Sequence, residues 1–186
     1  MDETSTFVHA LRSWTPEWLI AIRLTLACVL GGLIGLEREL GGHDAGIRTH
    51  ILVSLGSCVF TLVSWELYQH IRAIEQPVTG DPIRIIEAVT AGAGFLAAGI
   101  IFQSGAKVHG LTTGAGVWTA AAIGVACGTG AYAIAVITTL LVLGVLFALA
   151  FMKRKMGLDD RSAPQDRQDN PTLPTDKSPP PNQTPS

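Results

Sequence analysis

Five apolar runs constrain the fold of this chain more than any other feature of its sequence. They lie at about residues 17–36, 47–68, 83–103, 111–127 and 130–152. A helix that crosses the hydrocarbon core of a bilayer needs about 20 predominantly apolar residues, and four of the runs reach that length. The fourth run is shorter and only weakly hydrophobic, so other helices would have to shield it from lipid. We predict an all-α integral membrane protein, a bundle of about five transmembrane helices, with four as the alternative.

The charged residues divide the chain into parts of different character. Residues 17–152 hold 14 charged side chains over 136 positions, whereas the 34 residues after them hold 11. Seven of the ten prolines lie beyond Gly157, in a segment with almost no large apolar side chains. Such a composition cannot bury enough surface to offset the entropy of ordering. We predict an N-terminal segment at 1–16, a transmembrane domain at 17–152 and a disordered, Pro-rich cytoplasmic tail at 153–186. A ligand for a small recognition domain is the alternative for the tail's "SPPP".

The lysines and arginines between the runs predict the orientation in the membrane, because cytoplasmic loops carry an excess of both. If the N-terminus lies outside, the cytoplasmic side receives six such residues: Arg38, Arg48, Lys107, Lys153, Arg154 and Lys155. The outer side then has three: Arg12, Arg72 and Arg84. We therefore expect the N-terminus outside and the C-terminus inside.

Several classes of function find no support in the sequence. The net charge is −2, and no basic cluster interleaved with aromatic residues is present, so the expected partner is the lipid bilayer and not nucleic acid. Patterns typical of hydrolases, zinc proteases and phosphate-binding loops are missing, so we expect neither an enzyme nor a cofactor. The three cysteines lie inside apolar runs without C-x-x-C spacing, which indicates buried thiols. His43, Asp44 and His50 lack a recognised ligand spacing, so no metal site is expected.

The segment "DPIRIIEAVTAGAGFLAAGIIF", residues 81–102, carries a charge of each sign near its start. In the predicted orientation it runs parallel to the first run, and Glu87 then lies at nearly the depth of Arg23, about 9 to 12 Å along each helix. Arg84 is close enough to the helix start to reach the surface. Because a charge inside a membrane needs a partner, we predict an interhelical ion pair between Arg23 and Glu87. A substrate or ion site at these residues, and an Arg23 that simply lies at the interface, are the alternatives.

Two further patterns concern helix ends and helix packing. Thr15 with Pro16, and Asp81 with Pro82, are typical of helix starts. The loop residues 35–50, rich in both charge and glycine, are expected to form a solvated cytoplasmic connection. Small residues let membrane helices approach closely, and we assign that role to Gly92, Gly94, Gly99, Gly116, Ala120, Gly124 and Gly128. An unwound, substrate-binding fourth helix is the alternative.

Four blocks of sequence together resemble the MgtC/SapB family of bacterial inner-membrane proteins. They are "GLERE" at 35–39, "GIRTHILVSLG" at 46–56, residues 81–102 as quoted above and "VHGLTTGAGVWTAAAIGVACGTGAY" at 108–132. The resemblance covers about 125 residues. Its charged and polar motif positions correspond here to Glu37, Arg38, Arg48, Thr49, Asp81, Arg84, Thr112 and Thr113.

The resemblance implies a five-helix membrane domain and a role in growth at limiting magnesium, survival in host cells and control of the membrane ATP synthase. The family is generally not considered a transporter. Glu87 departs from the family, which more often has an uncharged residue there. Many relatives also carry a soluble cytoplasmic domain after the last helix, so this chain resembles a short form. We expect contacts with another membrane complex or with further copies of the chain, and a small magnesium or proton transporter or channel subunit is the alternative.

Overall fold

A computed structural model describes residues 13–73, 83–104 and 107–155. Its helices are α2 (Glu17–Leu40), α3 (Ile47–Ala73), α4 (Ile83–Ile100), α5 (Leu111–Thr129) and α6 (Tyr132–Lys155). In the described part of the chain, five helices are long and apolar enough to cross a membrane. The prediction of five spans is confirmed, including the short fourth run. The side of the membrane on which each terminus lies stays a prediction.

Not all of the predicted segments lie within this description. The chain falls into two compact units, Met1–Leu149 and Ala150–Ser186, and of the second only the end of α6 is described. The predicted Pro-rich tail beyond residue 155, most of the N-terminal segment and the predicted start at Asp81 lie outside the described residues.

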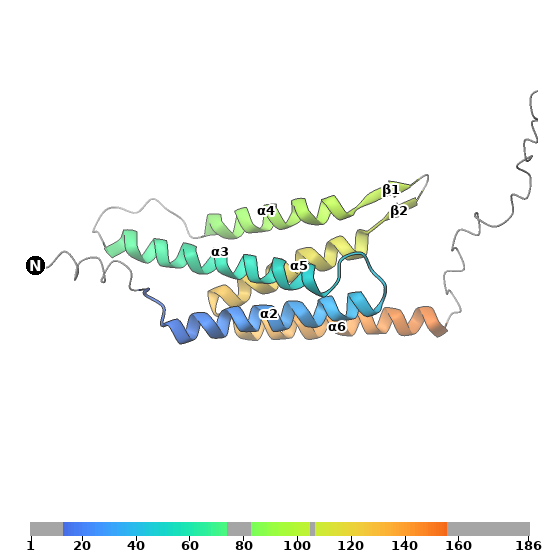
Figure 1. Cartoon of the computed structure of the whole chain (residues 1–186), viewed down its shortest axis with the longest axis horizontal. Helices are drawn as coiled ribbons and strands as arrows, with labels where there is room; N and C mark the ends of the chain where they lie inside the picture. Colours follow the sequence, from blue (N-terminus) through green and yellow to red (C-terminus); the bar gives the residue numbers. More distant parts are fainter. Residues whose placement is uncertain (1–12, 74–82, 105–106, 156–186) are drawn as a thin grey trace, which may run out of the picture. The chain divides into compact units, whose positions relative to one another are not determined.

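A short β-hairpin between α4 and α5 was not expected from the sequence. Strands β1 (Phe102–Ser104) and β2 (Lys107–His109) pair antiparallel, with Phe102 opposite His109 (Figure 1). Gly110 follows the hairpin and starts α5 with a φ of +81°, a left-handed conformation that favours glycine. The hairpin thus connects α4 to α5, and Gly110 is the residue at which the chain turns into α5.

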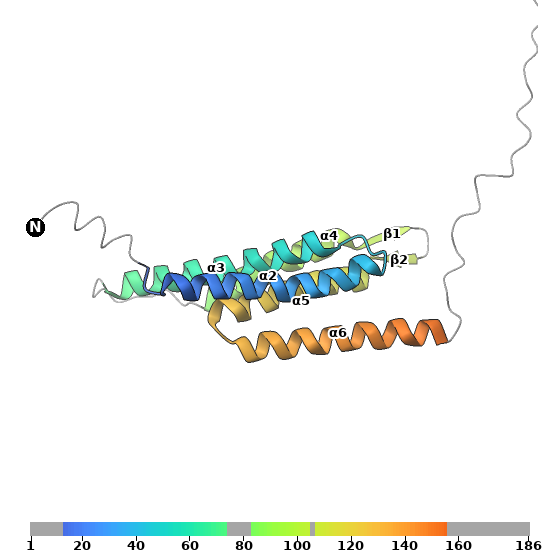
Figure 2. The same ribbon diagram turned by 60° about the horizontal axis from the view of Figure 1, so that its bottom comes forward.

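The bundle is built on α3, which packs most extensively against α5 and α2, while α4 lies on α5 (Figure 1). The core joins α2, α3 and α5 through side chains such as Leu30, Ile34, Cys58 and Ile123. Helix α6 runs along one side of the bundle and adds the buried Ala135 and Leu146 (Figure 2). Most other side chains of α6 are exposed.

The weakly hydrophobic α5 is the most enclosed of the helices. Of its most apolar 18-residue window 56% is buried, compared with 11% for α4 and 17% for α6. It can lie there because its small residues let α3 approach: a Cβ at Gly128 would lie 2.7 Å from the Thr61 Cβ. The other helices thus shield α5 from lipid.

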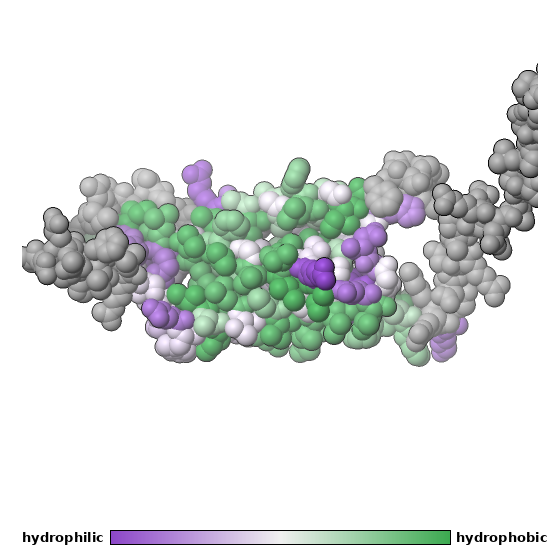
Figure 3. Space-filling view, viewed as in Figure 1, coloured by the Kyte–Doolittle hydropathy of each residue, from purple (hydrophilic) through white to green (hydrophobic). Residues whose placement is uncertain are grey.

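The glycines of α4 behave differently from those of α5. A Cβ added at Gly92, Gly94 or Gly99 would meet no side chain and no other helix within 4 Å, apart from its two chain neighbours. Within one copy of the chain, these residues therefore make no close helix contact, contrary to the packing role predicted for them. Figure 3 shows apolar side chains over most of the visible face, with hydrophilic groups on the left and from just right of its centre.

The start of α2 also differs from the prediction. Pro16, and not Thr15, occupies the N-cap position, and no side chain caps the helix there. The Pro16 carbonyl accepts the N–H groups of Leu19 and Ile20 at 2.9 and 3.1 Å. Thr15 is instead held by a residue of α3, as described below.

Candidate functional site

Polar side chains gather at both ends of the bundle, and the first group lies where α2 turns into α3. Glu37 and Arg38 form an ion pair of 2.6 Å between Oε2 and Nε, with side chains only 11% and 6% exposed. Arg38 Nη1 donates to His43 Nε2 at 3.3 Å. His43 Nε2 must then accept, so His43 Nδ1 carries the proton that it donates to the Arg38 carbonyl at 3.2 Å. These contacts fix the end of α2 to the loop that follows it.

The same loop is tied to the start of α3. The Glu39 carboxylate accepts the N–H of Ile47, the first residue of α3, at 2.8 Å. An anion at this end of a helix offsets the unpaired N–H groups and the positive end of the helix dipole. Asp44 and Arg48 are exposed, as expected of a solvated connection, whereas Arg38 is buried. The expectation of a solvated loop therefore holds for only part of residues 35–50.

His50 is the most deeply buried polar group of this end. It is fully buried where α3 meets α2 and α5: a Cβ at Gly35 would lie 3.0 Å from the His50 Cβ, and one at Gly116 3.2 Å from its Nε2. Nδ1 donates to the Gly46 carbonyl at 2.9 Å. Nε2, which is left as an acceptor, is buried without a hydrogen-bond partner among the described residues. The His50 ring is therefore held by the Nδ1 hydrogen bond and by close packing against Gly35 and Gly116.

A line of small polar side chains continues from His50 along one face of α3, a pattern that the sequence reading did not single out. Ser54, Ser57 and Thr61 follow at intervals of three or four residues and are all buried. Ser54 donates to the Ala27 carbonyl of α2 at 2.9 Å, and Thr61 donates to the Ser57 carbonyl at 2.8 Å. The signal was present in the sequence as polar residues at helical spacing inside an apolar run.

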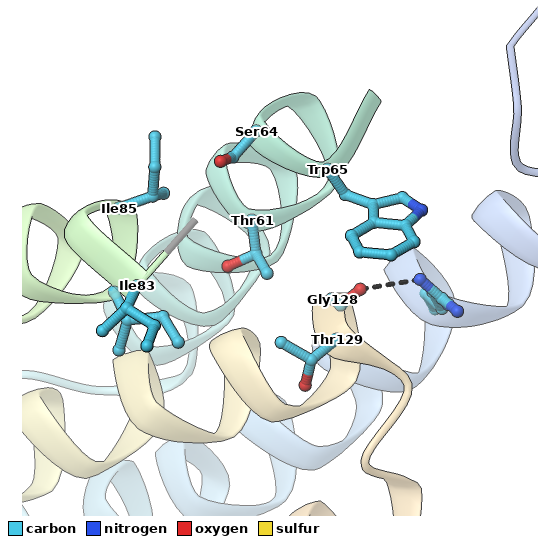
Figure 4. A pocket seen from close by; sticks show the side chains of 9 residues that line it. Thr61, Ser64, Trp65, Ile83, Ile85, Gly128 and Thr129 are labelled. Atoms are coloured by element: carbon cyan, nitrogen blue, oxygen red, sulfur yellow. Dashed lines mark hydrogen bonds between the residues drawn. The ribbon is translucent and has the colours of Figure 1, made fainter. Parts of the chain in front are cut away.

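At the opposite end of the bundle this line leads to a cavity of about 290 Å³ between α2, α3, α4 and α5. Its walls include Arg23, Thr61, Ser64, Trp65, Ile83 and Ile86, together with Gly128 and Thr129 at the end of α5. Figure 4 shows Thr61 and Thr129 facing the same space, with the Trp65 ring beside the Gly128 carbonyl. We refer to this space as the Arg23 cavity.

Arg23 is bonded to the junction of α5 and α6. Its Nη1 donates to the Gly128 carbonyl at 2.7 Å, the dashed line in Figure 4. Its Nε donates to the Tyr132 hydroxyl at 3.2 Å. Gly128 lies in the last turn of α5, where carbonyl groups lack intrahelical donors and the helix dipole is negative. A cation is stabilised at such a site without a carboxylate.

The predicted ion pair between Arg23 and Glu87 is not formed in this structure. Glu37–Arg38 is the only ion pair in the part of the chain that is described. Helix α2 packs against α3 and α5, while α4, which carries Glu87, packs against α5 and α3. The guanidinium therefore meets the end of α5 and not α4. Arg84 and Glu87 are both exposed.

The remaining motif positions are spread over the bundle. Thr113 is buried at the start of α5, next to the exposed Thr112. Thr49 is half-buried beside the exposed Arg48 in the first turn of α3. None of the four is among the residues that line the Arg23 cavity.

Glu66 of α3 is a structural residue that the sequence reading missed. Its carboxylate accepts the N–H of Trp14 at 2.7 Å and that of Thr15 at 2.9 Å. The Trp14 ring also meets the His70 ring edge to face, with centroids 6.2 Å apart. The chain before α2 is thus tied to the end of α3. No local pattern indicates a contact over 51 residues of sequence.

The two polar ends of the bundle are held by hydrogen bonds and one ion pair among the described residues. Among residues 13–73, 83–104 and 107–155, no three His, Cys, Asp or Glu side chains lie together as a group that could hold a metal ion. Arg23, Glu37 and Arg38 bond to a carbonyl, a hydroxyl, a histidine and one another, which orients the helices that carry them.

Comparison with known proteins identifies the family. The sequence pattern of the MgtC family matches residues 24–155. This chain belongs to the MgtC family. It is 41% identical over 140 residues to the "Putative magnesium transporter YhiD" of Escherichia coli K12. The aligned residues make up 74% of this chain and 64% of that protein. No solved structure matches this chain.

Two other members of the family show the same extent of similarity. Protein SapB of Bacillus subtilis is 36% identical over 150 residues, 80% of this chain and 64% of SapB. Protein MgtC of Brucella abortus is 40% identical over 134 residues, 71% of this chain and 52% of that protein. The chain thus spans less than two thirds of the length of these relatives. With its five candidate spans, it is a multi-pass bacterial membrane protein.

Proposed function

We propose that this protein acts in adaptation to magnesium limitation or to host or acid stress, through contacts between its helices and another membrane complex. The ATP synthase is the partner that we expect. On this proposal the chain is not an enzyme: its action is to bind and constrain a neighbour. Membership of the MgtC family supports the link to magnesium, since one relative is named as a putative magnesium transporter.

The observation that carries the proposal is the exposed face of α4. Phe95 and Leu96 are 80% and 54% exposed, and beside them Gly92 and Gly99 have nothing within 4 Å of an added Cβ. Apolar side chains gain little from a protein neighbour over lipid, whereas small residues allow the close backbone approach that drives helix association in membranes. A face that combines exposed apolar side chains with small residues is suited to packing against a helix of another protein.

Transport of magnesium or protons is the second candidate. The line of polar side chains on α3, from His50 to the Arg23 cavity, favours it because a conduction path needs polar groups across the depth of the membrane. Three contacts oppose it. The Ser54 and Thr61 hydroxyls each donate their proton to a backbone carbonyl. Helix α5 also packs so closely against α3 that a methyl group at Gly124 would not fit.

Site-specific photo-crosslinking in native membranes tests the proposal. A photo-reactive residue at Phe95 of α4 is compared with one at Leu141 of α6, which is 65% exposed and serves as the matched control. We expect ATP synthase subunits joined to position 95, more strongly at limiting magnesium, and not to position 141. Equal products from both positions, or none containing ATP synthase subunits, would contradict the proposal.

A flux assay decides between the two candidates. The purified protein is placed in liposomes that contain a magnesium-sensitive or pH-sensitive dye. Flux that Ser57→Leu abolishes, while the exposed-face change Phe60→Leu leaves it intact, would support transport in place of helix contacts. We expect no flux above that of empty liposomes.

A further inference from the structure

Arg23 lines the Arg23 cavity, and none of the residues that the structure describes gives it an anionic partner. An arginine side chain carries five N–H groups, and the recorded bonds to Gly128 and Tyr132 use one on Nη1 and one on Nε. No carboxylate lies within ion-pair distance of it in the described ranges. A carbonyl and a phenol satisfy donors but do not neutralise the charge. The site therefore keeps a positive charge and N–H groups beyond those two bonds.

The walls of the cavity suit a ligand that is part anion and part hydrocarbon. Ile83 and Ile86 of α4 supply apolar surface opposite Arg23. The Ser64 hydroxyl and the Trp65 indole N–H add polar groups, and neither has a recorded partner in the described part of the chain. Thr61 and Thr129 donate their hydroxyl protons to carbonyls of their own helices, so they contribute acceptors and methyl groups.

The position of the cavity along the helices narrows the class of ligand. Arg23 lies about 9 Å along α2 from its first residue, at 1.5 Å per residue. The cavity also lies beside the end of α5 and the start of α4, two to three turns before the end of α3. Helix ends of this kind sit where headgroups border hydrocarbon, and tryptophan is enriched at that level. Arginine is well suited to phosphate and carboxylate because its planar fork can donate two parallel hydrogen bonds.

We propose that the Arg23 cavity binds the phosphodiester headgroup of an anionic phospholipid, with Arg23 on the phosphate and the glycerol and acyl region against Ile83 and Ile86. This inference does not depend on the proposed function, since it concerns a lipid and not a protein partner. Free phosphate or a soluble phosphate ester would offer Arg23 the same anionic group. The experiment below distinguishes binding of these soluble anions from binding of a lipid.

Native mass spectrometry of the full chain from detergent measures the binding. The probes are phosphatidylglycerol, diacylglycerol with the same acyl chains, and inorganic phosphate. We expect retained phosphatidylglycerol, little diacylglycerol, and no displacement by millimolar phosphate. Displacement by phosphate would identify a soluble anion as the ligand and overturn the lipid assignment. Equal retention of phosphatidylglycerol and diacylglycerol would overturn the anion site altogether.

Three variants locate the site. Arg23→Gln should weaken phosphatidylglycerol binding about tenfold or more, as expected for the loss of a charged hydrogen bond, and Arg23→Lys should restore part of it. Arg72→Gln is the matched control, because Arg72 is an exposed arginine in the last turn of α3 and does not line the cavity. Equal binding by Arg23→Gln and Arg72→Gln would show that Arg23 only clamps α5.

A separate variant keeps the test valid if Arg23→Gln fails to fold. Ser64→Asp leaves the bonds of Arg23 to Gly128 and Tyr132 in place and adds a carboxylate to the cavity wall. The carboxylate should repel the phosphate and neutralise Arg23, so binding should fall by a similar factor. Retained binding in a folded Ser64→Asp protein would contradict the proposal.

Discussion

The backbone at Gly124 of α5 lies directly against the Ser54 carbonyl of α3, so that a Cβ at Gly124 would overlap that oxygen. It would also lie 2.9 Å from the Ser57 Cβ. Contacts of this kind set the distance between the two helices that pack most extensively. The face of α3 with Ser54 and Ser57 and the small residues of α5 are therefore two halves of one interface.

Gly124→Ala should destabilise the protein by about 1 to 3 kcal/mol, because the added methyl group forces α5 away from α3. The free energy of unfolding can be measured by SDS titration in mixed micelles. Gly92→Ala on α4 is the control: it has nothing within 4 Å of its Cβ position, so helix propensity alone should leave it unchanged or about 1 kcal/mol more stable. If both changes cost the same, the close contact is not what sets stability.

Glu66→Ala should release the segment before α2 from the end of α3. The buried Thr15 N–H would lose its acceptor, and the unpaired donor should cost about 1 to 2 kcal/mol. Trypsin should also cut after Arg12 faster, since residues 14 and 15 are no longer tied to α3. Glu17→Ala removes an exposed acid near the same helix start that has no recorded hydrogen bond, so it should cost no more than about 1 kcal/mol. Equal effects of the two changes would argue against the tie.

Glu37→Gln should be among the most destabilising single changes at the other end of the bundle. It leaves Arg38 buried without an anion, and breaking a buried ion pair costs roughly 3 kcal/mol. Replacing both residues, as Glu37→Gln with Arg38→Met, removes the uncompensated charge and should recover part of that loss. A double-mutant cycle on the free energy of unfolding measures this coupling. Additive effects would show that the two charges act independently.

The parts of the fold that were predictable are those that depend on hydropathy. Apolar runs, four of them about 20 residues long and one shorter, predicted the five helices. The four-residue spacing of Gly116, Ala120, Gly124 and Gly128 marked the face of α5 that meets α3. The same reasoning finds no close helix contact within one copy of the chain at Gly92, Gly94 and Gly99, where no neighbouring side chain or helix lies within 4 Å of an added Cβ in the described structure. A small residue allows a close contact, but the arrangement of the helices decides whether one forms.

The candidate site was harder to predict, because the residues that form it depend on which helices pack against each other. Arg23 and Glu87 were predicted to lie at similar depths, yet depth alone does not say that α2 packs against α5. The partner of Arg23 is a backbone carbonyl at a helix end, and carbonyls leave no mark in the sequence. Glu66 and Thr15 are likewise joined by tertiary packing over 51 residues.

The bond between Arg23 and Tyr132 leads to a prediction about α6, whose contact with the core is limited to a few side chains such as Ala135 and Leu146. Tyr132→Phe removes the hydroxyl that accepts from Arg23 Nε and should cost about 1 kcal/mol. Hydrogen exchange of the amides in the first turns of α6 should become faster, since the start of the helix loses a tie to α2. Tyr68→Phe is the matched control, because the Tyr68 hydroxyl has no recorded bond within the described ranges. Exchange in α6 that responds equally to both changes, or to neither, would show that Tyr132 does not anchor the helix.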